Sequence, residues 1–198
     1  MTDSPARLRV GILISGQGSN MEALVRRSLE PDCPYDVALV ISNRPKAAGL
    51  AAAEALGVAA RIIDHSDFGQ DREGHERTID AALRAAGCQV IALAGYMRIL
   101  TPFLVEGWSG RMINIHPSLL PNYPGLDTHR RAMEAGDAEA GCSVHLVTTG
   151  LDAGTVLGQA RVAILPDDTV ASLAGRVLAA EHQLYPQCLA DFVRTALT

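Results

Sequence analysis

The stretch "LRVGILISGQGSN", residues 8–20, decides the fold of this chain. Its first eight residues are mostly aliphatic and predict a buried strand, and a glycine-rich turn, "SGQGSN" (15–20), follows directly. A helix candidate begins at about residue 20. The order of strand, glycine-rich turn and helix is typical of the first unit of an α/β protein with a parallel sheet.

Strands and helices continue to alternate along the chain. Apolar runs predict strands at 8–15, 36–42, 60–64, 90–95, 112–115 and 143–148, and amphipathic stretches predict helices at 20–29, 45–56 and 71–86. After about residue 150, "TVLGQARVAIL" suggests an antiparallel addition and 169–197 a long C-terminal helix. We therefore predict one domain over residues 1–198, a Rossmann-like, doubly wound and mostly parallel sheet.

Composition favours a small-molecule ligand. Of 198 residues, 48% are hydrophobic and only 4% aromatic, which suits an aliphatic interior under helices. The net charge of −5 argues against a general nucleic-acid binder, which would need a basic surface for phosphates.

The cysteines Cys33, Cys88, Cys142 and Cys188 are scattered without C-x-x-C spacing. They predict free thiols in a reducing compartment rather than a zinc site or a disulfide framework. No apolar core follows the N-terminus, and no run approaches the roughly 20 apolar residues of a membrane span. We expect a cytoplasmic protein with no membrane partner.

The turn at 15–20 predicts an anion site, because glycines and a helix N-terminus expose backbone N–H groups to a phosphate. A dinucleotide fingerprint would need glycine where Met21 stands, although Arg44 leaves an NADP enzyme as an alternative. A second alternative is purely structural, with Ser19 or Asn20 capping the helix.

The central segment "RMINIHPSLLPNYPG" (111–125) carries two polar residues in an apolar strand. Asn114 and His116 are two residues apart, so they share one face of the strand, which must end at Pro117. An amide and an imidazole at a strand end suggest a functional pair. The alternative is that loop backbone merely satisfies both side chains.

A third polar residue, Asp152, lies in "SVHLVTTGLDAG" (143–154). A carboxylate on a loop after a strand lies where open α/β sheets bind ligands, and near His116 it would orient the imidazole and favour its charged form. Alone, Asp152 is as readily explained as a turn former.

Other chemistries lack their signals. The sequence has no G-x-S-x-G, no Walker lysine and no H-E-x-x-H. His116, His129 and His145 are irregularly spaced, which argues against a metal site.

Three segments together carry a family resemblance. "SGQGSN" (15–20), the block from Gly95 to Gly125 and "CSVHLVTTGLDAGTVLGQARV" (142–162) resemble phosphoribosylglycinamide formyltransferases, the folate-dependent enzymes of purine synthesis. Methionyl-tRNA formyltransferases share the Asn-x-His and Asp pattern but add a C-terminal domain, and formyltetrahydrofolate hydrolases add an N-terminal one. We expect this chain to have room for neither.

The resemblance implies formyl transfer from 10-formyltetrahydrofolate, as co-substrate, to the amine of glycinamide ribonucleotide, without a metal. Its implied catalytic residues are Asn114, His116 and Asp152. Those for the ribonucleotide are Gly18, Ser19, Asn20 and Glu181. Those for the folate are Arg72, Met97, Arg98, Ile99, Leu100, Asn114, Thr148, Thr149, Gly150, Leu151 and Asp152. The N-terminal half would hold the phosphate and ribonucleotide, and the C-terminal half the folate and the catalytic groups.

Asp127 departs from the family pattern, since bacterial relatives often have His there. Its charge would act on His116 if the two lay close, and the competing interpretation is a helix cap near Thr128. At the level of function, the alternative to a formyltransferase is a phospholigand-binding or NADP-linked Rossmann protein. A homodimer is compatible with the sequence, which does not fix the oligomeric state.

Overall fold

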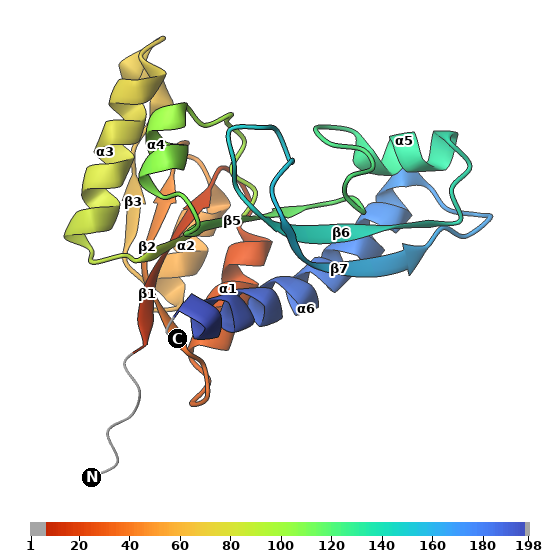
Figure 1. Ribbon diagram of the computed structural model, residues 1–198, viewed down its shortest axis with the longest axis horizontal. Coiled ribbons are helices and arrows are strands. Elements are labelled where there is room, and N and C mark those ends of the chain that lie inside the picture. The colour runs from red at the N-terminus through yellow and green to blue at the C-terminus, as the bar shows by residue number, and fades with distance from the viewer. Residues whose placement is uncertain (1–6, 197–198) are drawn as a thin grey trace.

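One twisted sheet organises the molecule in our computed structural model, which describes residues 7–196 (Figure 1). Within that range the sheet has seven strands in the order β3-β2-β1-β4-β5-β6-β7. Strands β1 to β5 run parallel, and β6 and β7 are antiparallel additions. The predicted doubly wound, mostly parallel fold is confirmed. The strand bounds are β1 Leu8–Ile14, β2 Tyr35–Ser42, β3 Ala60–Ile62, β4 Val90–Leu93, β5 Met112–His116, β6 Glu139–Leu146 and β7 Val156–Ala163.

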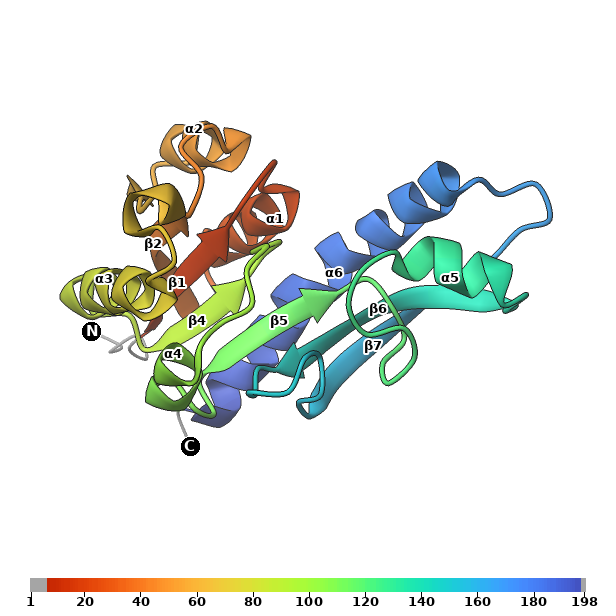
Figure 2. The same ribbon diagram turned by 90° about the horizontal axis from the view of Figure 1, so that it is seen from above.

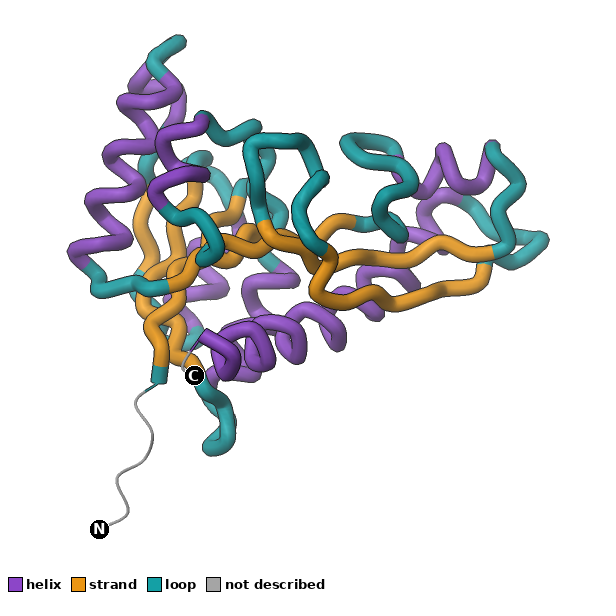
Figure 3. Tube along the Cα trace, viewed as in Figure 1, coloured by secondary structure: helices purple, strands orange, loops and turns teal. Residues whose placement is uncertain are grey.

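The helices lie on both faces of this sheet (Figures 1 and 3). Their bounds are α1 Ser19–Ser28, α2 Ala48–Ala55, the 3₁₀ helix η1 His65–Phe68, α3 Arg72–Ala85, α4 Pro102–Gly107, α5 Thr128–Glu134 and α6 Val170–Ala196. The sequence patterns gave no sign of η1 or α4, because elements of four and six residues are too short to show helical periodicity.

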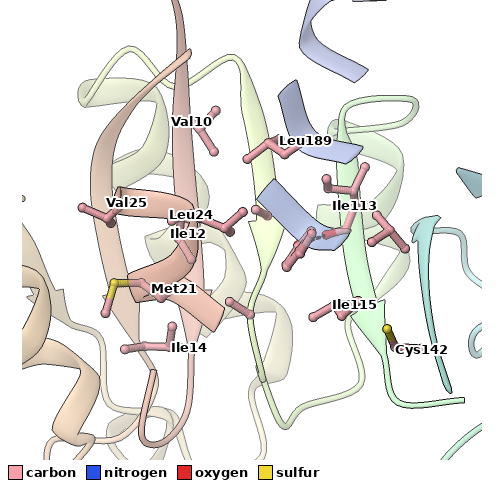
Figure 4. Close-up of a cluster of buried hydrophobic side chains, with 14 of the residues drawn as sticks. Val10, Ile12, Ile14, Met21, Leu24, Val25, Ile113, Ile115, Cys142 and Leu189 are labelled. Atoms are coloured by element: carbon pink, nitrogen blue, oxygen red, sulfur yellow. Dashed lines mark hydrogen bonds between the residues drawn. The ribbon is translucent and has the colours of Figure 1, made fainter. Parts of the chain in front are cut away.

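Alternation along β1 divides the core into two layers. Val10, Ile12 and Ile14 pack against α1 and α6, while Leu13 faces the layer of α3 and α4. Figure 4 shows the first layer, and Figure 2 shows α1 and α6 on the opposite side of the sheet from α3 and α4. Both faces of the parallel part are covered, which explains its nearly continuous apolar strands.

Gly11 lets α3 approach the sheet closely. A Cβ at this position would lie 2.2 Å from Cδ2 of Leu83 and 3.2 Å from Sγ of Cys88. The glycine in the middle of an apolar strand is therefore a packing requirement.

The antiparallel part begins one strand earlier than the sequence suggested. We placed the change of pattern after residue 150, but β6 already runs antiparallel to β5, with Asn114 opposite His145 and His116 opposite Ser143. Strand direction depends on how the connection through α5 crosses the sheet. An apolar run does not encode it.

Among the helices of residues 7–196, none combines the length and apolar character that a membrane span requires. The same described residues hold no cluster of three or more His, Cys, Asp or Glu side chains arranged to bind a metal ion.

Candidate active site

The end of β5 places Asn114 and His116 on the sheet face opposite α6. The alternate residues Ile113 and Ile115 pack in the layer that contains α6, so the two polar side chains point the other way. The loop before α5 and the loop between β6 and β7 lie above these strands in Figure 1. His116 is 6% exposed, so the imidazole is buried beneath these loops.

Asp152 reaches the same place from the loop between β6 and β7. Its Oδ2 lies 3.4 Å from Nδ1 of His116 and accepts a hydrogen bond from the N–H of Gly125 at 2.9 Å. Our reason for expecting this contact was wrong, since β6 is antiparallel and its C-terminal end pairs with the start of β5. The loop folds back over the sheet instead, and Asp152 adopts the left-handed conformation, with φ 49°.

Asp152 is held in its charged form. Burial raises the pKa of its carboxyl, but the hydrogen bond from the Gly125 N–H and the nearby His116 imidazole lower it, and that pKa lies below 3.8, its ordinary value. A buried carboxylate of this kind requires an adjacent cation or several donors.

Both ring nitrogens of His116 face hydrogen-bond acceptors. Nδ1 faces the Asp152 carboxylate, and Nε2 lies 3.0 Å from the carbonyl oxygen of Tyr123. Because a carbonyl and a carboxylate oxygen only accept, this geometry fits the imidazolium, which has two donors. The site thus sets an imidazole that can donate from both nitrogens beside a carboxylate.

The loop that supplies the Tyr123 carbonyl is fixed by its own side chains. The Tyr123 hydroxyl donates to Asp137 at 2.7 Å, and the Arg131 guanidinium lies 5.2 Å from the centre of the Tyr123 ring. Arg131 also donates to the carbonyl of Pro124 at 2.7 Å. These contacts hold Gly125 and Tyr123 over the end of β5.

A second buried imidazole, His145, joins the cluster from β6. Its Nε2 lies 3.2 Å from Nδ2 of Asn114 and 3.6 Å from Oδ1 of Asp152. The sequence pattern indicates His145 only as one of three histidines that could be considered for a metal site. Its role depends on strand register, which places it opposite Asn114, and no pattern in the sequence specifies that register.

The residues expected around a phosphate meet at the start of α1. Gly18 has φ 82° and occupies the N-cap position without a side-chain cap, so the helix begins at Ser19. The capping interpretation is wrong, because Asn20 instead donates from Nδ2 to Glu181 at 2.6 Å. Only a residue that tolerates left-handed backbone fits position 18, where a Cβ would also lie 2.7 Å from Cα of Gly49.

Glu181 and Asn20 form a buried polar pair. Burial raises the pKa of Glu181, and the hydrogen bond from Asn20 offsets this only in part. The Oδ1 atom of Asn20 is buried without a partner. A cavity of about 490 Å³ lies between α1 and α6, with Ser19 and His182 in its lining, but neither Asn20 nor Glu181 lines it. Asn114, His116 and Asp152 do not line it.

The predicted folate residues come together around β4 and α3. Arg72, the first residue of α3, donates from Nη2 to the carbonyl oxygen of Ile99. Met97 donates its N–H to the Ser15 hydroxyl at 2.8 Å. The side chains of Met97 and Ile99 are 64% and 68% exposed, while Arg98 and Leu100 are half-buried. This segment presents the apolar side chains of Met97 and Ile99 to solvent.

The remaining predicted folate residues, Thr148 to Leu151, share the loop of Asp152. The Thr148 hydroxyl donates to the Gly150 carbonyl at 3.4 Å, and Leu151 is 60% exposed. The loop closes tightly, because a Cβ at Gly154 would lie 1.7 Å from the carbonyl oxygen of Leu146.

Asp127 does not cap α5 through its side chain, as one interpretation of the sequence expected. It occupies the N-cap position of α5 with φ 58°, but its side chain makes no cap hydrogen bond. Its exposed carboxylate pairs with Arg130 instead. The carboxylate partner of His116 is Asp152.

The NADP alternative finds no support in the first turn. Met21, a residue of α1 that stands where a dinucleotide fingerprint has its third glycine, is fully buried in the core with residues of β1. Arg44 is exposed.

Comparisons with known proteins identify the family. Residues 8–189 match the model of the family described as formyl transferase. Phosphoribosylglycinamide formyltransferase of Escherichia coli K12 is 41% identical over 93% of this chain and 87% of its own length. This chain belongs to the phosphoribosylglycinamide formyltransferase family. The crystal structure of the Brucella melitensis member has a TM-score of 0.91 and 50% identity, over 94% of this chain and 96% of that one.

Some relatives of this formyltransferase family are much longer. The trifunctional purine biosynthetic protein adenosine-3 of Drosophila melanogaster is 47% identical over 98% of this chain, which spans only 14% of the fly protein. The similarity is therefore confined to one part of that protein.

Proposed function

We propose that this chain transfers the formyl group of 10-formyltetrahydrofolate to the amine of glycinamide ribonucleotide, giving formylglycinamide ribonucleotide and tetrahydrofolate in de novo purine synthesis. The observation that carries the proposal is the cluster of an amide, an imidazole and a carboxylate at the end of β5. Membership of the formyltransferase family supports the same reaction.

The residues of the cluster suit formyl transfer. A neutral amine attacks the formyl carbon, negative charge develops on the formyl oxygen, and the departing nitrogen must gain a proton. Asn114 supplies an N–H donor for that oxygen. His116, kept charged by Asp152, stabilises the developing charge and delivers the proton. The chemistry needs no covalent enzyme intermediate and no metal.

The ribonucleotide would bind at the start of α1. Backbone N–H groups at Gly18, Ser19 and Asn20 carry no side-chain cap and lie at the positive end of a ten-residue helix, which suits a phosphate. Glu181, beside Asn20, offers carboxyl oxygens to ribose hydroxyls.

The folate would bind between the loop that follows β4 and the loop that joins β6 to β7. Backbone groups of Met97 to Leu100 suit the hydrogen-bonding edge of a flat pterin, and residues Thr148 to Asp152 form the opposite wall. Arg72 lies next to this segment and could pair with a carboxylate of the folate tail. We place the reaction in the cytoplasm, where reducing conditions suit four free cysteines.

An absorbance assay tests the proposal. The chain is incubated with glycinamide ribonucleotide and 10-formyltetrahydrofolate, and the folate spectrum is followed. We expect conversion to tetrahydrofolate that depends on both substrates. Conversion that proceeds equally without the ribonucleotide would show hydrolysis instead, and no conversion would reject a formyltransferase.

A further inference from the structure

His145 is a buried titratable residue to which the mechanism above gives no part. Its side chain is 3% exposed, and it contacts both Asn114 and Asp152. A polar group buried this deeply is retained only when its hydrogen bonds are satisfied. The partners of its two ring nitrogens therefore show which protonation state the site holds.

The contacts of His145 select one neutral tautomer. Nδ1 lies 2.8 Å from the carbonyl oxygen of Leu146, which can only accept, so Nδ1 carries the hydrogen. In the neutral ring Nε2 is then an acceptor. It faces Nδ2 of Asn114, a donor, at 3.2 Å.

The charges of the cluster favour the same assignment. Asp152 is the single anion, and its Oδ2 already faces Nδ1 of His116, whose Nε2 faces the Tyr123 carbonyl. A charged His145 would place its Nε2–H directly against the N–H₂ of Asn114. The distance from Nε2 to Oδ1 of Asp152, 3.6 Å, is longer than a hydrogen bond.

We propose that neutral His145 is a positioning residue, which accepts one N–H of the Asn114 amide and so directs the other toward the formyl oxygen. Without this acceptor the amide can turn by 180° and present its carbonyl oxygen, which would repel the developing negative charge. The catalytic meaning of this contact rests on the proposed formyl transfer, but the hydrogen bond itself does not.

Two substitutions separate positioning from packing. Asn at position 145 can keep the contact with the Leu146 carbonyl but does not reach Asn114, whereas Gln places an acceptor oxygen near the former Nε2. We expect H145N to lower kcat about tenfold with little change in KM, a part of the 10²- to 10³-fold effect of losing an oxyanion donor, and H145Q to lower it less. Equal losses in the two variants, or none in either, would contradict the proposal.

A double-mutant cycle shows whether the effect passes through Asn114. In an Asn114→Ala background, H145N should cause no further loss of kcat, because no amide remains to be oriented. The same loss in both backgrounds would indicate a general structural role and overturn the proposal.

NMR of the substrate-free chain tests the contact independently of activity. Ring ¹⁵N shifts of His145 near pH 7.5 should show a protonated Nδ1 and a bare Nε2, and H145N should move the side-chain amide resonances of Asn114. An Nε2–H tautomer or a charged ring would reject the assignment. A wild-type chain without formyl transfer would reject the proposed function while this spectrum still decides the role of His145.

Discussion

The two ends of the proposed substrate cleft each bury a carboxyl group, and the two groups are in opposite electrostatic states. Glu181, at the start of α1, has one hydrogen-bond donor, and burial raises its pKa. Asp152 is half-buried, and a backbone N–H and the His116 imidazole lower its pKa against the effect of burial. Glu181 is the more deeply buried of the two, so burial and the number and charge of the partners together decide which carboxyl stays ionised. The ionised one lies where charge must be handled during the reaction.

The largest expected difference between the two ends lies in turnover. Asp152→Asn should lower kcat by about 10²- to 10⁴-fold, because His116 loses the carboxylate that faces its Nδ1. Glu181→Gln, the matched change at the other end, should act mainly on the KM for glycinamide ribonucleotide. Steady-state kinetics of both variants measure this. A Glu181→Gln variant with the greater loss of kcat would invert the comparison.

Asn114→Ala and His116→Ala should each lower kcat by roughly 10²-fold or more, the scale for losing an oxyanion donor or a proton-transfer group. Circular dichroism and thermal melts serve as controls for folding. Wild-type turnover in either variant would remove that residue from the mechanism.

Asn20→Ala tests the proposed ribonucleotide site through ligand binding rather than turnover. We expect about tenfold weaker binding of glycinamide ribonucleotide, the scale for losing one or two hydrogen bonds, and nearly unchanged binding of a folate analogue. Calorimetry with each ligand is the measurement. Equal losses for both ligands would point to a folding defect or to a misplaced phosphate loop.

The two carboxyls should also change stability with pH in opposite directions. Asp152 has a lowered pKa, so its contribution is present above 3.8, its ordinary value, and is lost as pH falls through the folded pKa. Glu181 has a raised pKa, so its contribution is present below 4.5 and is lost as pH rises through the folded value.

Urea unfolding between pH 3 and 7 can separate these contributions. At neutral pH, Asp152→Asn should have a lower free energy of unfolding than wild type, and this difference should shrink as pH falls. The free energy of unfolding of Glu181→Gln should rise relative to wild type as pH rises. The exposed pair of Asp127 with Arg130 provides a control, Asp127→Asn, with little expected change. Parallel curves for the two buried variants would show that both carboxyls share one charge state.

The smallest effect is expected at Asp127 itself. Its carboxylate pairs with Arg130 at the surface, so Asp127→Asn should leave the kcat–pH profile unchanged. A shifted profile would mean that this charge reaches His116 despite its exposure.

Only the part of the polar cluster that lies within one strand could be predicted from the residue pattern of the sequence. Asn114 and His116 share a face because strand residues alternate, and that rule needs no tertiary information. Asp152 was expected near His116 for a reason that fails, because β6 is antiparallel and the loop must fold back over the sheet. His145 was missed because only the pairing of β5 with β6 places it opposite Asn114.

The sequence predicted the fold more completely than the site. Apolar runs and helical stretches marked five parallel strands and three of their helices, since each is long enough to show its period. The contact between Asn20 and Glu181, 161 residues apart, followed from family resemblance alone. Such a pair depends on α6 packing against α1, which no local pattern specifies.

Isotope transfer tests the central claim, formyl transfer to the ribonucleotide amine, most directly. 10-Formyltetrahydrofolate with a ¹³C-formyl group is incubated with the chain and with glycinamide ribonucleotide whose amine is ¹⁵N. The ¹³C signal should acquire a one-bond coupling to ¹⁵N, and His116→Ala should form this product far more slowly. Label that appears in free formate, or that remains on the folate, would contradict the account.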